Sequence, residues 1–365
     1  MRSNELLIIQ PLLAGYRVSF FNDLSQFFDK VTIMADIKEQ KDFGASLKKI
    51  SADILHAPIL GERTKLYYQQ GIVKKIFKCR PKSIFIAADF RAISFWAVLV
   101  SSKVLRIPVF THGQGLYDKP NPKLLYKIIF KAAVILSSRY ICYTDFSKRT
   151  AEAIGVQSNK LAVMNNTIVN SSPITPETKN VKTKRLIYIG RLREGSNLEL
   201  LLEAMKILKK RSVFCSLDII GDGEKIKEYK SYVRKAEIDV VFHGAIFDDE
   251  VISEISKSAV AGVYPGDAGL SIVHYMSLSL VPIAHNDITK HMGPEPSYIK
   301  NMINGILFER NNVISLAESI DYVISNPSSA KEIFENSYIT YQNLTSISMA
   351  EILMSSMNEF LKDQS

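Results

Sequence analysis

The stretch AVAGVYPGDAGLSIVH, residues 259–274, places an apolar run before a turn of small residues and a helical pattern after it. The run predicts a buried strand, and the turn leads into a helix expected over residues 269–279. Small residues at the carboxyl end of a strand let a ligand approach the backbone, and free amides at a helix start favour an anion. The sequence therefore predicts a nucleotide site at this turn, formed by Gly266, Gly269, Leu270, Ser271 and, one helical turn further on, His274.

Apolar runs and helical patterns alternate in both directions from this stretch, as expected of parallel α/β folds. In the second half the expected strands are residues 185–189, 216–220, 240–242, 259–264 and 281–284, and the expected helices are 198–210, 225–236, 249–257, 269–279 and 314–325. In the first half the expected strands are 6–9, 30–34, 83–87, 108–111, 140–143 and 161–164, with a buried helix over 91–105. The sequence thus predicts an α/β protein with two doubly wound sheets.

Length and composition predict where the domains divide. The chain has 365 residues, which is long for one domain, and 47% of them are hydrophobic, enough for two cores. Residues 165–184 shift to Asn, Ser, Thr and Pro with little periodicity, which indicates a linker. We expect an N-terminal domain over residues 1–168, a C-terminal domain over 180–330, and a helical tail over 331–365 that crosses back to the first domain.

Charge is distributed unevenly. Residues 1–179 hold 26 Lys and Arg against 13 Asp and Glu, a net charge of +13, whereas residues 180–365 hold 20 against 24, a net charge of −4. This asymmetry predicts that the first half meets an anionic partner, with a merely soluble basic face as the alternative. The three widely spaced cysteines suggest neither a disulfide framework nor a zinc site, which favours a reducing, cytoplasmic location.

Two further turns follow apolar strands in the second half. In GRLREGSN, residues 190–197, Gly190 and Arg191 suit a phosphate group, with an ordinary turn as the alternative. Ser196 and Glu199 predict a capping box for the helix that follows. In IIGDGE, residues 219–224, Gly221 and Gly223 permit a tight turn, for which a structural role is the stronger alternative.

These three turns, with Phe242-His243-Gly244, resemble the nucleotide-binding domain of the retaining glycosyltransferases of family 4, over residues 184–325. The resemblance implies the GT-B fold, an α/β architecture of two Rossmann-like domains facing a central cleft. It also implies that Arg191 grips the donor diphosphate and that the turn residues and His243 lie on the donor side.

Three positions depart from the family pattern. The family lysine five residues after the arginine is Ser196 here, and its two glutamates, which have seven residues between them, are Gly266 and His274. A subset of bacterial surface-polysaccharide transferases is similar in having a histidine at the second position and a downstream Pro-Glu, here Pro294-Glu295. The resemblance implies that His274 hydrogen-bonds the ribose. It also implies that Asp267 or Glu295 replaces the missing carboxylate.

The first domain offers residues for the acceptor side. LLAGYRVSFFN, residues 12–22, resembles the opening loop of that subset, which implies an acceptor-side position for Gly15, Tyr16 and Arg17. Asp89 and His112 each follow an expected strand, so both should face the same cleft. The predicted catalytic residues are therefore His112, Asp89 and Asp267. A buried structural histidine is the alternative for His112, and an N-cap is the alternative for Asp89.

Basic stretches in the first domain predict contact with an anionic membrane surface. Residues 63–82 interleave lysines and arginines with aromatic and aliphatic residues, and Lys123, Lys127 and Lys131 repeat at i,i+4. Ordinary helices with a solvated basic face are the alternative. The longest uncharged stretch, 268–286, contains two histidines and a proline, so we expect no membrane span. We interpret residues 1–15 as a first strand and its loop, with a signal peptide as the alternative.

Together these features predict a transferase that moves a sugar from a nucleotide-sugar donor to a polyprenyl-linked saccharide acceptor in surface polysaccharide synthesis. It would act at the inner face of the cell membrane. No Asp-x-Asp motif occurs, so we expect neither a metal nor another cofactor. No motif that reads nucleic acid occurs either. A nucleotide-sugar epimerase of the same plan and a catalytically inactive sugar-nucleotide-binding relative remain as alternatives.

Overall fold

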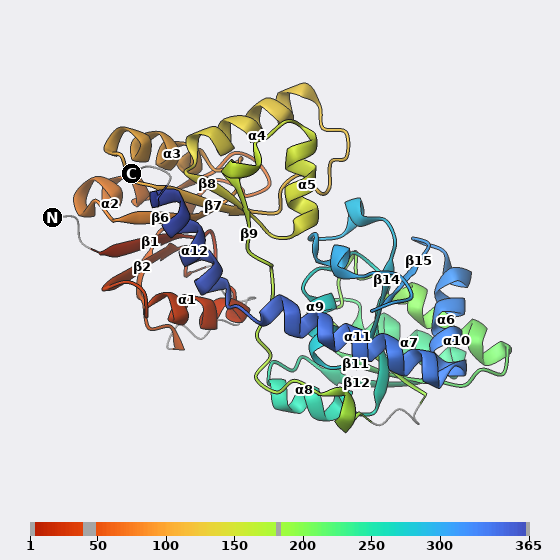
Figure 1. Cartoon of the computed structure of the whole chain (residues 1–365). Coiled ribbons are helices and arrows are strands. Elements are labelled where there is room, and N and C mark those ends of the chain that lie inside the picture. Colours follow the sequence, from red (N-terminus) through yellow and green to blue (C-terminus); the bar gives the residue numbers. More distant parts are fainter. Residues whose placement is uncertain (1–3, 39–48, 180–183, 363–365) are drawn as a thin grey trace. The chain divides into compact units, whose positions relative to one another are not determined.

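The computed structural model describes residues 4–38, 49–179 and 184–362. The chain forms two compact units, each with its own parallel sheet. Unit 1 consists of Met1–Asn166 and Ile347–Ser365, and unit 2 is Thr167–Ser346 (Figure 1). The expected α/β architecture with two Rossmann-like domains is confirmed. The start of the chain before residue 4 and the predicted domain boundary at residue 180 lie outside the described residues.

Unit 1 is built on a seven-stranded sheet with the order β3-β2-β1-β6-β7-β8-β9, in which all neighbouring strands are parallel. Its elements are β1 Glu5–Ile9, α1 Val18–Leu24, β2 Lys30–Ala35, β3 Asp53–His56, β4 Ile59–Leu60, β5 Tyr68–Gln69, α2 Ile72–Cys79, β6 Ser83–Ala87, α3 Ile93–Leu105, β7 Val109–Gly113, α4 Leu124–Leu136, β8 Arg139–Cys142, α5 Asp145–Ala153, β9 Leu161–Val163 and α12 Met349–Lys362. The short strands β4 and β5 form a separate antiparallel pair.

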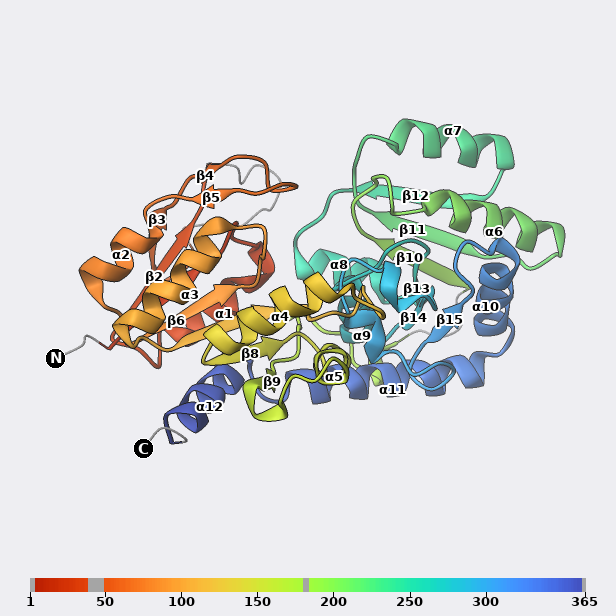
Figure 2. The ribbon, with the colours of Figure 1, turned by 90° about the horizontal axis from the view of Figure 1, so that it is seen from above.

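Helices cover both faces of this sheet. Successive residues of a strand point to opposite faces, so Leu6 and Ile8 of β1 join a core with α1 and α12, whereas Leu7 and Ile9 join one with α2 and α3. Figures 1 and 2 show α2, α3 and α4 side by side on the second of these faces. The central strands of the sheet are therefore sandwiched, which is typical of parallel sheets.

Unit 2 has a six-stranded parallel sheet with the order β12-β11-β10-β13-β14-β15. Its elements are β10 Arg185–Ile189, α6 Leu198–Lys210, β11 Ser216–Ile220, α7 Ile226–Ala236, β12 Asp239–Gly244, α8 Asp249–Ser256, β13 Ala259–Tyr264, α9 Ser271–Ser277, β14 Val281–His285, β15 Ile306–Phe308, α10 Val313–Ser325 and α11 Pro327–Thr345. Counted within the unit, the strand order is 3-2-1-4-5-6. The order reverses between β10 and β13, the switch point where doubly wound sheets bind ligands.

Close packing fixes α9 on this sheet. A Cβ built on Gly262 of β13 would lie 2.3 Å from the ring of Tyr275, so only a glycine lets the α9 tyrosine approach so closely. The Tyr275 hydroxyl accepts a hydrogen bond from the Ile189 amide at 3.0 Å. The ring thus ties α9 to both strands that flank the switch point.

The tail differs from the prediction. Helix α11 contributes Ile333, Phe334 and Tyr341 to the core of unit 2, because it packs against α9 and β14. The chain therefore returns to unit 1 only at Ile347, not at residue 331. There α12 buries Leu353 and Met357 in the core that contains Phe20 and Phe21 of α1.

Several local predictions need correction. Residues 63–82 do not form one helix, since β5 and the turn at Gly71 precede α2, which begins at Ile72. The helix expected over 269–279 is the shorter α9. The Ser196 capping box does not form, because Asn197 in a left-handed conformation precedes α6 and Ser196 is fully buried. No helix in the described part of the chain is long and apolar enough to cross a membrane.

Candidate functional site

A pocket of about 260 Å³ lies in unit 2 beyond the carboxyl ends of the strands at the switch point. It is bordered by the loops after β10 and β13, by the start of α6, by the residue before α7, by the last residue of β14 and by the residues after β15. The lining residues are Glu194, Gly195, Asn197, Glu199, Lys225, Pro265, Gly266, Asp267, His285, Arg310 and Asn311. The two flanking loops are the ones in which the sequence predicted a nucleotide site.

Glycines allow the loops behind this pocket to touch through their backbones. A Cβ on Gly221 would lie 1.9 Å from the carbonyl oxygen of Gly190, and one on Gly223 would lie 2.0 Å from that of Leu192. Hydrogen bonds join the same loops, from the Gly190 amide to the Ile220 carbonyl at 3.0 Å among others. Packing alone thus requires Gly221 and Gly223, and donor contacts by these glycines remain a prediction.

Gly266 joins the loop after β13 to the loop after β10 in the same way. A Cβ on Gly266 would lie 2.1 Å from the carbonyl oxygen of Gly195 and 2.6 Å from the carbonyl carbon of Ser196. The Asp267 amide donates to the Gly195 carbonyl at 3.0 Å. The floor of the pocket is therefore a contact between two backbones that no larger residue could preserve.

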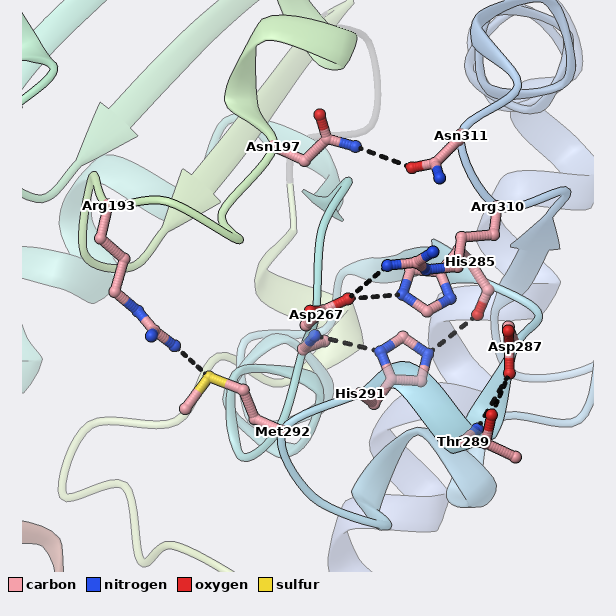
Figure 3. A network of polar contacts seen from close by, with 11 residues as sticks. Arg193, Asn197, Asp267, His285, Asp287, Thr289, His291, Met292, Arg310 and Asn311 are labelled. Atoms are coloured by element: carbon pink, nitrogen blue, oxygen red, sulfur yellow. Dashed lines mark hydrogen bonds and ion pairs between the residues drawn. The ribbon is translucent and has the colours of Figure 1, made fainter. Parts of the chain in front are cut away.

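Asp267, one of the predicted catalytic residues, lines the pocket but is not a free carboxylate. Its Oδ1 lies 3.4 Å from a terminal nitrogen of Arg310 and 3.4 Å from Nε2 of His285 (Figure 3). His285 is almost wholly buried, and this burial lowers its pKa. At neutral pH the imidazole is uncharged, so Arg310 supplies the positive charge next to Asp267.

A second histidine locks the loop after β13 in place. His291 Nδ1 accepts from the Ala268 amide at 3.1 Å, and its Nε2 donates to the His285 carbonyl at 3.0 Å (Figure 3). Its ring stacks on that of His285 with centroids 3.7 Å apart. Burial and the neighbouring His285 lower the pKa of His291 to about 3. An imidazolium could not accept from the Ala268 amide, so this geometry requires neutral His291.

The predicted residues that depart from the family pattern lie in buried surroundings. Ser196 is fully buried, so its position gives no support to a contact with a donor. The Nε2 atom of His274 is shielded from solvent and has no hydrogen-bond partner among the described residues. Burial lowers the pKa of His274 to about 4, partly offset by the negative charge of Asp249. His274 is thus neutral at pH 7, and its Nε2 is a shielded nitrogen without a partner among the described residues.

The remaining predicted donor residues occupy several environments. Gly269, Leu270 and Ser271 form the turn into α9, where a Cβ on Gly269 would meet nothing closer than the Glu295 carboxylate at 3.6 Å. Glu295 is buried, close enough that a Cβ on Gly293 would lie 2.1 Å from its Oε2. Arg191 is exposed on the loop after β10.

His243 has a partner inside the unit. Its Nε2 lies 2.7 Å from Oδ1 of buried Asp218, whose other oxygen accepts from Arg185 at 2.9 Å. This structural role is sufficient to explain the histidine, and its assignment to the donor side stays a prediction.

In unit 1 the predicted residues gather at the carboxyl ends of β1, β6 and β7. His112 is buried between Phe85 and Tyr143, with ring centroids at 5.4 and 4.4 Å, and its Nε2 has no hydrogen-bond partner among the described residues. Burial lowers the pKa of His112 well below its usual value, and the positive charge of Arg17 lowers it further. The structure therefore places neutral His112 near Arg17.

The Arg17 side chain is anchored within unit 1. It donates to Oδ1 of Asn166 and to the sulfur of Met349. Gly15, Tyr16 and Arg17 form a single 3-10 turn before α1, with Tyr16 half exposed beneath the guanidinium. The acceptor-side assignment of these three residues stays a prediction.

Asp89 is not an N-cap. The cap of α3 is Ala92, and Asp89 instead accepts from the Tyr67 hydroxyl at 3.0 Å and from the Arg91 amide at 3.1 Å. The carboxylate raises the pKa of Tyr67, although burial of the phenol is the larger cause. Because the Ala88 amide donates to the His112 carbonyl at 2.8 Å, the loop that holds Asp89 lies beside His112.

Sequence reasoning missed Lys225, His285 and Arg310. Arg310 was missed because the three-residue strand β15 before it was not predicted. Since it follows that strand, Arg310 lies at the same edge of the sheet as the other pocket residues. Lys225 follows the turn of Gly221 and Gly223, so its position at this edge could have been inferred. It pairs with Glu199 at 2.6 Å. In the described part of the chain, no three His, Cys, Asp or Glu side chains are grouped to hold a metal ion.

One family of known proteins is similar to unit 2. Residues 174–340 match the family described as glycosyl transferases group 1. This range spans nearly all of unit 2 and includes every residue that lines the pocket. Unit 2 is therefore similar, over nearly its whole length, to glycosyl transferases group 1.

Individual relatives are distant in sequence. An uncharacterised glycosyltransferase of Haemophilus influenzae is 22% identical over 163 residues, which span 44% of this chain and 45% of that protein. The match thus covers less than half of the length of this curated relative.

Solved structures resemble the whole chain. HepE of Anabaena in complex with UDP has a TM-score of 0.70 and 14% identity, with 98% of this chain and 99% of that chain covered. The lipopolysaccharide outer core galactosyltransferase WaaB has a TM-score of 0.69 and 15% identity, with 97% of this chain and 99% of that chain covered. Sucrose-phosphate synthase of Thermosynechococcus elongatus has a TM-score of 0.71 and 14% identity, with 99% of this chain and 100% of that chain covered. At these identities the likeness establishes the fold, which is the GT-B fold expected from the sequence.

Proposed function

We propose that this protein is a glycosyltransferase that moves a sugar from a nucleotide-sugar donor to a lipid-linked saccharide acceptor. The transfer would retain the anomeric configuration, need no metal, and serve surface polysaccharide synthesis at the inner, anionic face of the cell membrane. The observation that carries the proposal is the pocket at the switch point of unit 2. It lies within the residues that match glycosyl transferases group 1, at the place where doubly wound sheets bind nucleotides.

Cations at and near the pocket would meet a departing nucleoside diphosphate, and they lie beside the lining carboxylates Glu194, Glu199 and Asp267. As the bond between the sugar and the diphosphate breaks, negative charge grows on the leaving oxygen and must be stabilised. Arg191 on the loop after β10 would contact the diphosphate. Lys225 and Arg310, which line the pocket, would supply positive charge that the buried Ser196 cannot. UDP is the natural first probe, since the similar HepE was solved with UDP and with UDP-glucose.

The direct test is to titrate UDP into the purified protein and then to supply UDP-sugars with a polyprenyl-diphosphate-linked saccharide. Transfer to the acceptor is expected, and the anomeric configuration of the product tests retention. Absence of nucleotide binding would favour an inactive relative. Conversion of the donor sugar without any acceptor would favour an epimerase instead.

Arg191→Ala should weaken UDP binding about tenfold or more. A charge-assisted hydrogen bond to a phosphate contributes roughly 1.5–3 kcal/mol, and the mutation removes it while leaving an exposed position without strain. Calorimetric titration measures the effect. Arg234→Ala on α7 is the matched control, because Arg234 is also exposed but lies on a helix and not on the loop after β10. Equal affinities in the two variants would remove Arg191 from the site.

His274→Ala should weaken UDP binding a few-fold to tenfold and leave the binding of inorganic pyrophosphate nearly unchanged. The reason is that pyrophosphate lacks the ribose to which the unpartnered ring nitrogen would bond, and one such hydrogen bond contributes about 0.5–1.5 kcal/mol. Competition titrations with both ligands make the comparison. A sharp fall in melting temperature at unchanged UDP affinity would instead define His274 as a core residue.

A further inference from the structure

The helices α2, α3 and α4 of unit 1 form a layer with an unusual outer surface. Helix α3 packs against both α2 and α4, and Figure 2 shows the three side by side. None of the three contains an aspartate or a glutamate, whereas all contain lysines. The helices on the opposite face of the sheet differ, because α1 contains Asp23 and α12 contains Glu351 and Glu359.

Large apolar side chains point outward from this layer. On α4, Leu124, Ile128 and Ile135 stand at i, i+4 and i+11, and they are 73%, 55% and 65% exposed. This spacing follows one face of a helix, so the three side chains form a stripe. On α3, Ile93, Val100 and Val104 repeat the pattern, with Val104 73% exposed. Contiguous exposed apolar surface of this kind marks an interaction site.

Lysines accompany the apolar stripes. Lys131 of α4 stands at i+7 from Leu124, on the same face, and Lys127 lies on its flank. On α3, Lys103 is exposed and precedes Val104. On the neighbouring helix α2, Lys74 and Lys78 are also exposed. Apolar side chains accompanied by lysines of the same helices fit a bilayer with anionic headgroups, because the hydrocarbon stems insert while the ammonium groups meet phosphates.

We infer that the outer surface of α2, α3 and α4 is the face by which this protein docks on an anionic lipid bilayer. This inference deepens the proposed function, since a lipid-linked acceptor is presented at such a surface. A second copy of the chain fits less well. A two-fold contact through this face would place lysines opposite lysines, and like charges across an interface are repulsive.

The proposed docking surface overlaps the two basic stretches that the sequence predicted, through α2 and α4, and adds the exposed apolar side chains of α3 and α4. Residues 63–82 form only partly a helix, and Lys75 within it is paired with buried Glu5 at 3.6 Å instead of facing solvent. The exposed apolar stripes of α3 and α4 could not be recognised from their sequences, because helices buried all round have the same composition.

The test is co-sedimentation of the full chain with vesicles of phosphatidylcholine, with and without phosphatidylglycerol. Two variants of α4 separate the contributions of apolar and of charged side chains to vesicle binding. The apolar variant is Leu124→Ser, Ile128→Ser and Ile135→Ser, and the charge variant is Lys127→Gln and Lys131→Gln. Matched controls lie in unit 2: Phe214→Ser with Phe247→Ser for exposed apolar residues, and Lys227→Gln with Lys235→Gln for exposed lysines.

We expect the parent protein to bind phosphatidylglycerol vesicles, and to bind them less at high salt. The charge variant should lose about thirtyfold in partitioning to these vesicles, and the apolar variant at least tenfold. The controls should behave like the parent. UDP affinity should stay unchanged in all variants, which verifies the fold and separates docking from the donor site.

Two results would overturn the inference. One is equal sedimentation of parent and variants with both kinds of vesicle, which would leave the proposed glycosyltransferase activity standing on its own test. The other is a concentration-dependent dimer without lipid that the apolar variant abolishes, with no vesicle binding by the parent. That result would assign the face to self-association.

Discussion

Replacing Gly266 by alanine should destabilise unit 2 by about 2–4 kcal/mol and weaken UDP binding more than tenfold. The added Cβ would lie 2.1 Å from the Gly195 carbonyl oxygen and 2.6 Å from the Ser196 carbonyl carbon. Both are backbone atoms, so the clash cannot be relieved by a side-chain rotation. The loops after β10 and β13 must then separate, and they form the floor of the proposed donor pocket.

Gly269→Ala is the matched control for this prediction. It lies in the same loop, and its Cβ would meet nothing closer than 3.6 Å. Both substitutions lower the conformational entropy of the unfolded chain equally, which contributes about 0.4–1 kcal/mol to stability in each variant. The difference in their free energies of unfolding therefore measures the clash alone. Denaturant unfolding and calorimetry of both variants make the comparison. Equal stabilities would mean that the two loops do not pack as described.

His291→Ala should destabilise the protein by about 2–4 kcal/mol at pH 7, and the deficit should shrink by about 2 kcal/mol at pH 5. The first effect arises because the buried amide of Ala268 and the carbonyl of His285 lose their partner. The second arises because the parent protein itself loses stability in acid. Denaturant titrations of parent and variant across this pH range measure both effects.

The sign follows from the pKa of His291, which is about 3 in the folded chain against an ordinary value of 6.5. Above pH 6.5 the imidazole is neutral in both the folded and the unfolded chain, so the deficit should be constant there. Below pH 6.5 His291 binds a proton in the unfolded chain, whereas in the folded chain it stays neutral down to about pH 3. The free energy of unfolding therefore falls as the pH falls. A deficit independent of pH down to 5 would contradict the neutral, doubly bonded imidazole.

Sequence patterns predicted the central strands well, because buried parallel strands are continuous apolar runs. All five strands expected in the second half correspond to β10 to β14. The missed strands have weaker signals. In β3, Asp53–His56, exposed and half-buried residues alternate at the sheet edge, and β15 has only three residues.

The site was predicted in outline but not in its contacts. Its position at the ends of β10 and β13 follows from the order of strands and turns, which the sequence encodes locally. The contacts do not, because they join distant residues: Asp267 meets Arg310, and His285 stacks on His291. The burial of Ser196 next to Gly266 could not be predicted either, since a serine in a glycine-rich turn is expected to face solvent.

The path of the chain has a consequence for synthesis on the ribosome. The polypeptide leaves unit 1 after Asn166, completes unit 2, and returns at Ile347 to supply Leu353 and Met357 to the first core. At translation rates of about 5–20 residues per second, these side chains emerge roughly 10 to 40 seconds after Asn166. During that time the apolar side chains of α1 that pack against α12 remain uncovered. The half of the protein that is made first is thus the last to finish folding.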